Sequence, residues 1–386
     1  MSTRSKVPDS IDNTAALLPA GLGDVLPPLA EQEAAAIENL VAGFRSYGYE
    51  RVKPPLIEFE TGLLAGTGAS MASQTFRLMD PVSQRMMGLR ADITVQVARI
   101  AATRLAKMPR PLRLSYAGQV LRVKGTQLRP ERQFAQVGAE LIGIDAATAD
   151  AEIIILAAES LQRLNVAGLS VDIALPGLVP LVLGKEISHD LHEALDRRDI
   201  DAATQLGGAS GKTLAALISA CGPVAPALAA LDKISLPAQA HDIAQRLKDV
   251  IRQVSAALPK LTLTIDFVER RGFSYEQGIA FTLFARGIRG ELGRGGDYLI
   301  SIAEESTGEP ACGVTLYMDS VLRALPAQEP TQRLFLPHNT NVIRAAALRH
   351  EGWVTVMGLA KAKDDLSEAR RLGCTHILVA DKPTPV

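Results

Sequence analysis

Three arginines crowd one predicted hairpin and offer the clearest chemistry in the sequence. Residues 121–140 predict a strand, a polar turn and a second strand that ends at Glu140. Arg122, Arg129 and Arg132 all lie in this segment. Guanidinium groups donate forked hydrogen bonds to a carboxylate or a phosphate. A solvated charged turn explains the same composition, so the hairpin is either an anion-binding element or an exposed turn.

Two further polar residues open a predicted helix. Asp92 and Thr94 follow two strand-like runs that surround an Asp-Pro turn, and an apolar-periodic segment comes after them. An aspartate in the first turn of a helix caps it, and such a cap contributes about 1 kcal/mol. From the residue types alone, the pair is interpreted as a helix cap.

A fourth arginine, Arg271, lies with Tyr275 between two apolar runs in residues 261–287. The runs predict strands that are buried in a sheet. An arginine between such strands needs a carboxylate partner or an exposed cleft. A solvated arginine at the tip of a hairpin is the alternative.

Helices and strands must position these groups. Apolar residues recur at helical spacing over residues 30–47, and Gly48 ends this predicted helix. A second amphipathic helix is predicted over 151–164 and is followed by a strand. Residues 185–258, rich in Ala, Leu and Asp, predict a helical insertion.

The two ends of the chain have different character. Residues 1–16 are polar and are predicted to be disordered. After a proline-bearing linker, 325–330, residues 331–386 show a small βαβαβ pattern in which Gly352 and Gly373 end the helices. Runs of strands and separate helical segments together predict the α+β class.

Composition excludes several classes of protein. The 386 residues are 47% hydrophobic and 22% charged, which is typical of a soluble globular protein of about two to three domains. A net charge of −1 gives no overall basic field for nucleic acid. Cys221, Cys312 and Cys374 lie far apart, so neither a disulfide framework nor a metal site is expected. The absence of a leader and of a long apolar run predicts a cytoplasmic protein without membrane contact.

The basic hairpin resembles, without a gap, the second signature motif of class II aminoacyl-tRNA synthetases in its histidyl form. Lys124 stands where that motif has a glutamate. The matching residues are Arg122, Gln133, Phe134, Gln136, Gly138 and Glu140.

Two further segments carry the resemblance. Histidyl synthetases have L-R-P-E-G-T where this chain has Leu89 to Thr94, and their Glu and Thr hold the α-amino group of histidine. The Asp-Ile-Thr form found here looks more like the synthetase paralogues that regulate ATP phosphoribosyltransferase. Arg271 and Tyr275 match the histidine-specific R-G-L-D-Y-Y-T-G, in which the arginine contacts the substrate carboxylate, whereas Glu276 replaces the second tyrosine.

The part of the resemblance that concerns ATP is altered. In a working synthetase the helix of the third motif begins Glu-Arg, and that arginine packs on adenine and grips the phosphates. Here the pair is Asp319 and Ser320, and a serine has neither the charge nor the planar face for this task. Together with Lys124, this implies that aminoacylation activity is lost.

The resemblance implies a fold and a domain plan. Residues 17–325 would form a class II synthetase-like antiparallel sheet flanked by helices, with the helical insertion inside it. Residues 331–386 would form a truncated anticodon-binding-like α/β domain. The segment 47–60 is similar to the first class II motif, which builds the dimer interface, so a homodimer is implied.

The resemblance also implies a function, namely that of a non-catalytic regulatory subunit of ATP phosphoribosyltransferase. It would need no cofactor and would join a short-form catalytic subunit in a hetero-oligomer, with histidine as feedback effector of the first step of histidine biosynthesis. A divergent histidyl-tRNA synthetase and a tRNA-binding paralogue are the alternatives, and net charge makes nucleic acid the least favoured partner. The expected histidine-binding residues are Asp92, Thr94, Arg122, Gln136, Glu140, Arg271 and Tyr275.

Overall fold

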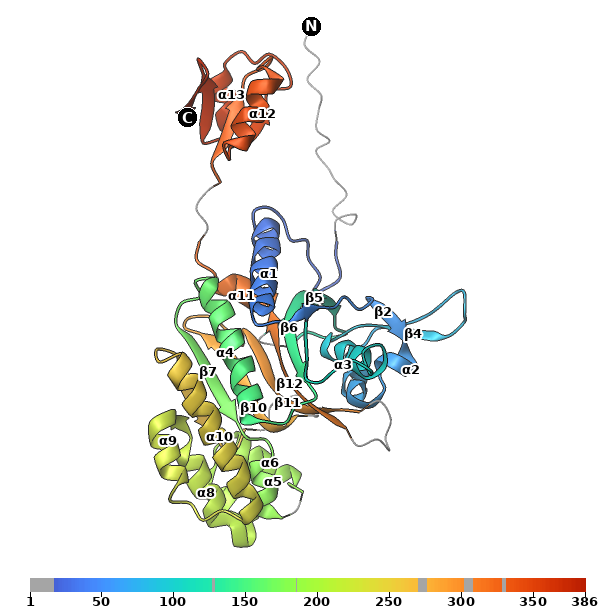
Figure 1. The fold of residues 1–386 in the computed structure, drawn as a ribbon, viewed down its shortest axis with the longest axis vertical. Coiled ribbons are helices and arrows are strands. Elements are labelled where there is room, and N and C mark those ends of the chain that lie inside the picture. The colour runs from blue at the N-terminus through green and yellow to red at the C-terminus, as the bar shows by residue number, and fades with distance from the viewer. Residues whose placement is uncertain (1–16, 127–128, 185, 270–275, 302–307, 328–330) are drawn as a thin grey trace. The chain divides into compact units, whose positions relative to one another are not determined.

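A nine-stranded mixed sheet forms the centre of the computed structural model (Figure 1). The structure describes residues 17–126, 129–184, 186–269, 276–301, 308–327 and 331–386. Most neighbouring strands are antiparallel, whereas β1 with β5 and β7 with β9 are parallel. In spatial order the strands are β1 (Glu50–Arg51), β5 (Leu112–Leu121), β6 (Gln133–Ile142), β12 (Glu309–Tyr317), β11 (Gly293–Ile300), β10 (Glu276–Ala285), β7 (Leu169–Ala174), β9 (Thr262–Asp266) and β8 (Gly222–Pro223).

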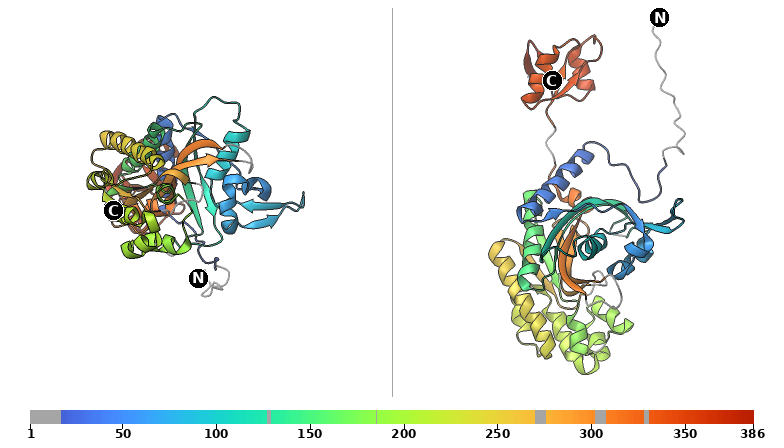
Figure 2. Two further views of the ribbon diagram at one scale, coloured as in Figure 1. Left: turned by 90° about the horizontal axis from the view of Figure 1, so that it is seen from below. Right: turned by 45° about the vertical axis from the view of Figure 1, so that its right-hand side comes forward.

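Helices cover both faces of this sheet. The long helices α1 (Leu29–Ser46) and α4 (Ala147–Arg163) pack on one face, where Ala135, Val137 and Leu141 of β6 belong to the same core as both helices. Helix α3 (Thr94–Thr103) packs on the other face and lies within the curve of the sheet (Figure 2). Because side chains alternate along a strand, the polar residues of β6 point toward α3.

Six helices occupy the interval between β7 and β9. They are joined into one core with the central sheet, because α10 presents a continuous apolar stripe that includes Leu247, Val250 and Val254. These helices are α5 (Leu178–Leu183), α6 (His189–Asp196), α7 (Ile200–Leu206), α8 (Gly211–Ala220), α9 (Val224–Leu231) and α10 (Ala238–Ala257).

A smaller three-stranded sheet precedes α3. Its strands β2 (Ile57–Phe59), β4 (Met86–Leu89) and β3 (Arg77–Met79) pair antiparallel, and the β3–β4 hairpin projects from the body of the fold (Figure 1). The predicted Asp-Pro turn lies at the tip, where Asp80 accepts hydrogen bonds from the backbone of Val82 and Ser83. Helix α2 (Glu60–Leu63) and the 3₁₀ segment η2 (Gly66–Gln74) connect β2 to β3.

The chain divides into two compact units, Met1–Leu325 and Pro326–Val386. Helix α11 (Met318–Ala324) ends the first unit. The second unit has a four-stranded sheet with its own small apolar cores, and its fourth strand pairs antiparallel. This strand was not predicted because Pro383 and Pro385 interrupt it, and an edge strand tolerates proline. The elements are β13 (Arg333–Leu336), α12 (Val342–His350), β14 (Val354–Met357), α13 (Asp365–Arg371), β15 (His376–Val379) and β16 (Lys382–Pro385).

The structure has the α+β architecture that the sequence predicted, a largely antiparallel sheet flanked by helices. In the described part of the chain, no helix is both long and apolar enough to cross a membrane.

The pairing of β6 with β12 generates a first prediction. Glu140 lies directly opposite Gly313, and a Cβ added to Gly313 would lie 1.7 Å from a carboxylate oxygen of Glu140. Gly313→Ala is therefore expected to lower the free energy of unfolding by roughly 2–4 kcal/mol, because the buried carboxyl must move. Chemical denaturation checks this. The control is Gly23→Ala, since nothing lies within 4 Å of that site, and equal stability of the two variants would contradict the prediction.

Candidate functional site

The candidate site begins with a buried carboxylate between α3 and β6. Asp92 is 1% exposed and accepts hydrogen bonds from the Thr94 backbone at 2.9 Å and from the Gln136 amide at 2.8 Å. The other end of the Gln136 amide accepts from the Ile93 backbone at 3.0 Å. The Arg122 guanidinium lies 3.9 Å from Asp92 and donates to the Ala91 carbonyl. The expected cap is displaced: Ile93 is the N-cap of α3 and has no side-chain cap bond, whereas Asp92 lies one residue earlier and anchors a polar cluster.

A second carboxylate lies deeper on the same face of the sheet. Glu140 is 1% exposed and accepts hydrogen bonds from the hydroxyls of Tyr298 at 2.8 Å and Tyr116 at 3.3 Å. Tyr116 also contacts the hydroxyls of Thr94 at 3.0 Å and Thr315 at 2.7 Å. Hydroxyl groups therefore link the two carboxylates into one network that spans α3, β5, β6, β11 and β12.

Burial changes the ionisation of this network. It raises the pKa of Glu140 to about 8, and the hydrogen bonds from Tyr298 and Thr94 only partly oppose that rise. Burial and the nearby Glu140 likewise raise the pKa of Tyr116 well above its usual value. Glu140 is therefore largely neutral at pH 7 in the protein by itself. A cation or a strong hydrogen-bond donor placed beside it would favour the carboxylate.

The structure brings together five of the seven residues expected from sequence: Asp92, Thr94, Arg122, Gln136 and Glu140. Arg271 and Tyr275 lie outside the described residues. Sequence reasoning missed Tyr116, Tyr298 and Thr315 as members of the site. Tyr298 carried a weak signal in its Gly-Gly-Asp-Tyr context, whereas nothing local distinguishes Tyr116 or Thr315 from ordinary strand residues.

Strand β11, which carries Tyr298, is fixed from its other face. Asp297 points toward the helices and lies 3.1 Å from the Arg246 guanidinium of α10. Arg246 also donates two hydrogen bonds, at 2.7 and 3.0 Å, to the buried Asp150 of α4, and it contacts Asp145. Burial and the neighbouring Asp150 raise the pKa of Asp297 to about 9. This cluster joins α4, α10 and β11 directly behind the candidate site.

The three hairpin arginines have separate roles. Arg132 donates to the carbonyls of Arg122 and Ala20. Arg129 is 5% exposed and donates two hydrogen bonds to Asp319, at 2.7 and 3.0 Å. Arg122 is the one beside Asp92. Arg129 and Arg132 are thus engaged by other parts of the chain. The hairpin is therefore not a simple solvated turn, and it does not present three free donors to an anion.

Side chains at the positions where the resemblance places ATP contact one another, and a cavity of about 490 Å³ remains beside Phe134 and Asp319. The Arg129 guanidinium lies 4.3 Å from the Phe134 ring centre and 3.9 Å from that of Tyr317. Ser320 is fully buried and accepts a hydrogen bond from Arg323 at 2.9 Å. An aromatic face covered by an internal guanidinium offers no platform to a planar base. A buried serine offers no charge to a phosphate.

Comparison with known proteins defines first the class and then the family. The family model described as histidyl-tRNA synthetase matches residues 21–321. A histidyl-tRNA synthetase from Nostoc sp. PCC 7120 has the same fold, with a TM-score of 0.77 and 18% identity over 94% of this chain and 91% of its own. A structure from Bacillus halodurans, titled as an ATP phosphoribosyltransferase regulatory subunit/histidyl-tRNA synthetase, has a TM-score of 0.78 and 23% identity over 92% of this chain and 96% of its own. The fold is therefore that of the histidyl-tRNA synthetase class.

Sequence relatives are more specific. The chain is 54% identical to an ATP phosphoribosyltransferase regulatory subunit of Rhodospirillum centenum, over 96% of both chains. It is 56% identical to the protein of that name from Paramagnetospirillum magneticum, over 95% of this chain and 97% of the relative. The chain belongs to the family of ATP phosphoribosyltransferase regulatory subunits.

The raised pKa of Glu140 predicts a pH dependence of stability. The unfolded chain releases this proton near pH 4.5, whereas the folded protein holds it to about pH 8. The folded state binds the extra proton in that window, so the free energy of unfolding falls as pH rises through it. Relative to Glu140→Gln, which stays neutral, the wild-type protein should lose on the order of 2 kcal/mol between about pH 6 and pH 8.

Denaturant titrations of both proteins at several pH values measure this difference. Asp297 titrates in both proteins, so its contribution cancels from the comparison. Parallel stability curves would show that Glu140 does not hold a proton in the folded state.

A separate prediction concerns the pair Arg129–Asp319. Removing one partner leaves the other buried without its counter-charge, so Arg129→Ala should cost roughly 3 kcal/mol of folding stability. A double-mutant cycle with Asp319→Asn should give a coupling above about 1.5 kcal/mol. The matched exposed pair Arg77–Glu60 should give less than about 1 kcal/mol. Similar coupling in the two cycles would refute a buried, structurally important pair.

Proposed function

We propose that this chain is the non-catalytic, histidine-sensing subunit of a heteromeric ATP phosphoribosyltransferase in the cytoplasm. Its partner would be a short-form catalytic subunit that joins ATP to phosphoribosyl pyrophosphate, the first step of histidine biosynthesis. Following the class II resemblance, the chain would act as a homodimer within that assembly. Family membership supports the regulatory role.

One observation carries the proposal for the site. The described residues of the amino-acid side form one polar cluster, whereas on the nucleotide side the Arg129 cation is paired with Asp319 and lies against Phe134. Adenylation needs charges that clamp the triphosphate as charge develops, and losing such a group costs about 3–4 kcal/mol of transition-state stabilisation. A chain that has polar groups for the amino acid but lacks free charges to clamp the triphosphate is suited to sensing the amino acid rather than activating it.

The proposed contacts follow from the chemistry of free histidine. Its ammonium matches the Asp92 carboxylate and the Gln136 amide oxygen, with Thr94 beside them. Its carboxylate matches a guanidinium, from Arg122 and, by the resemblance, from Arg271. Its imidazole matches Glu140, whose partner Tyr298 orients it. The resemblance adds Tyr275 to this set.

Regulation requires that histidine distinguish two arrangements of the complex. A ligand shifts such an equilibrium only by its difference in affinity for the two states. A tenfold difference corresponds to about 1.4 kcal/mol, which the loss of one charge-assisted contact can supply. Contacts with β11 and α3 are therefore sufficient in magnitude to carry feedback inhibition.

The test uses the chain co-purified with the short catalytic subunit from the same genome. Formation of phosphoribosyl-ATP should require both chains and should fall when histidine is added. Arg122→Ala should raise the histidine concentration for half-inhibition at least about tenfold, because a cation that pairs the ligand carboxylate is lost. Activity without histidine should be unchanged, since Arg122 contacts Ala91 and Asp92 within this chain and is not proposed to touch the catalytic subunit.

The control is Arg77→Ala, which removes a surface arginine that pairs with Glu60 and should leave inhibition unchanged. An Arg122→Ala complex that is inhibited like the wild-type complex would contradict the proposed site. Histidine-dependent exchange between ATP and pyrophosphate by this chain alone would contradict the non-catalytic assignment.

A further inference from the structure

The second unit ends its sheet with an open edge. The strand order β14-β13-β15-β16 leaves β14 with one hydrogen-bonded neighbour among the described residues. The Gly358 backbone N–H donates inward to the Leu336 carbonyl. Backbone groups alternate in direction along a strand, so those of Thr355 and Met357 point away from β13. Such an edge is a template for another strand.

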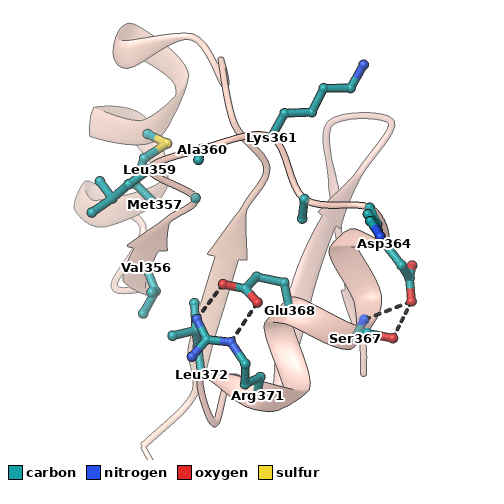
Figure 3. Close-up of a pocket in the computed structure, with 13 residues that line it drawn as sticks. Val356, Met357, Leu359, Ala360, Lys361, Asp364, Ser367, Glu368, Arg371 and Leu372 are labelled. Atoms are coloured by element: carbon teal, nitrogen blue, oxygen red, sulfur yellow. Dashed lines mark hydrogen bonds and ion pairs between the residues drawn. The ribbon is translucent and has the colours of Figure 1, made fainter. Parts of the chain in front are cut away.

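A groove lies on the α13 side of β14, at the end of this strand (Figure 3). It has a volume of about 760 Å³ and is bounded by β14, by residues 358–363 and by α13. The Glu368 and Arg371 side chains of α13 pair with each other at its side (Figure 3). Asp364 is engaged by the backbone and hydroxyl of Ser367. These charges of the groove are therefore satisfied within the unit.

The remaining lining is aliphatic and cationic. Leu359 is 90% exposed at the groove. Val354, which lies at the start of the edge strand outside the groove, is 46% exposed. Lys361 and Lys363 are exposed at the groove, and no ion pair joins either to a carboxylate among the described residues. Exposed apolar residues beside unpaired strand groups are a feature of binding surfaces.

We propose that this groove binds an extended, acidic–apolar segment of the catalytic subunit by adding it as a strand to β14. Main-chain hydrogen bonds to Thr355 and Met357 would supply binding that does not depend on sequence. Leu359 would cover an apolar side chain of the segment, and Lys361 with Lys363 would pair its carboxylates. The choice of partner rests on the proposed function, because the catalytic subunit is the protein that this chain is proposed to join.

The lining favours a protein segment over RNA. No aromatic side chain lines the groove among the described residues, so bases would find no stacking platform. Two lysines also give little charge for a phosphate backbone, whereas the open backbone edge matches a strand.

The first measurement is hydrogen exchange of the full chain, free and in complex with the catalytic subunit. The amides of Thr355 and Met357 should exchange at least about tenfold more slowly in the complex, because new ladder hydrogen bonds protect them. The opposite edge, β16, should be unaffected. Unchanged exchange of both β14 amides in a formed complex would overturn the proposal while leaving the proposed function standing.

Variants test the backbone and the charges separately. Thr355→Pro removes an outward N–H and should weaken the complex about tenfold. Thr355→Val is its matched control, since it keeps that N–H and loses only the side-chain contact with Arg349. Lys361→Glu with Lys363→Glu should also weaken the complex about tenfold, whereas Lys382→Glu on β16 should not. Thermal melting of each full-length variant verifies that the second unit is folded.

The other outcomes are decisive as well. Wild-type chain that forms no complex would contradict the proposed function itself. Protection of β14 that appears with increasing concentration of this chain alone would assign the edge to a second copy and overturn the proposal. Binding of tRNA that the two lysine substitutions abolish would overturn it in favour of nucleic acid. Tight complexes of both Thr355→Pro and the double lysine variant would overturn it directly.

Discussion

The structure depends on placing two carboxylates, Asp92 and Glu140, inside a sheet that otherwise excludes water. A polar group buried without partners costs several kcal/mol, so every neighbouring element must supply a donor. Gln136, Tyr116 and Tyr298 meet this requirement from three strands. Glycine opposite Glu140 leaves room for the carboxyl. The observed register therefore satisfies both carboxylates, because it brings donors from three strands to them and a glycine opposite Glu140.

The arginines near the candidate site differ in how firmly their partners hold them. Arg129 is paired with Asp319 and covers aromatic faces, so its position is set by folding. Arg122 lies 3.9 Å from Asp92 and makes no short ion pair there, so the fold constrains it less than it constrains Arg129. On the far side of the sheet, Arg246 ties α10 to β11. Tyr298 and Asp297 are consecutive on β11, so one strand connects the candidate site with the inserted helices.

The second unit has a folded core and one strand edge that this core leaves open. Its two modest apolar cores hold four strands and two helices, yet one strand edge is open. An unused edge with exposed apolar residues is a liability in a free protein. Its presence beside two unpaired lysines is consistent with a surface that a partner covers. Such a role needs neither catalysis nor nucleic acid.

The sequence alone determined the class of fold, and it predicted five candidate residues that the structure brings together: Asp92, Thr94, Arg122, Gln136 and Glu140. These five were selected by the resemblance to the class II motifs, because local periodicity by itself indicates only a hairpin and a helix start. Only the tertiary structure decided the roles of Tyr116, Tyr298, Thr315 and the pair Arg129–Asp319. Tyr298 and Glu140 are separated by 158 positions and meet through the strand order β6-β12-β11. No local pattern encodes that order, because it arises from packing the whole sheet between its two layers of helices.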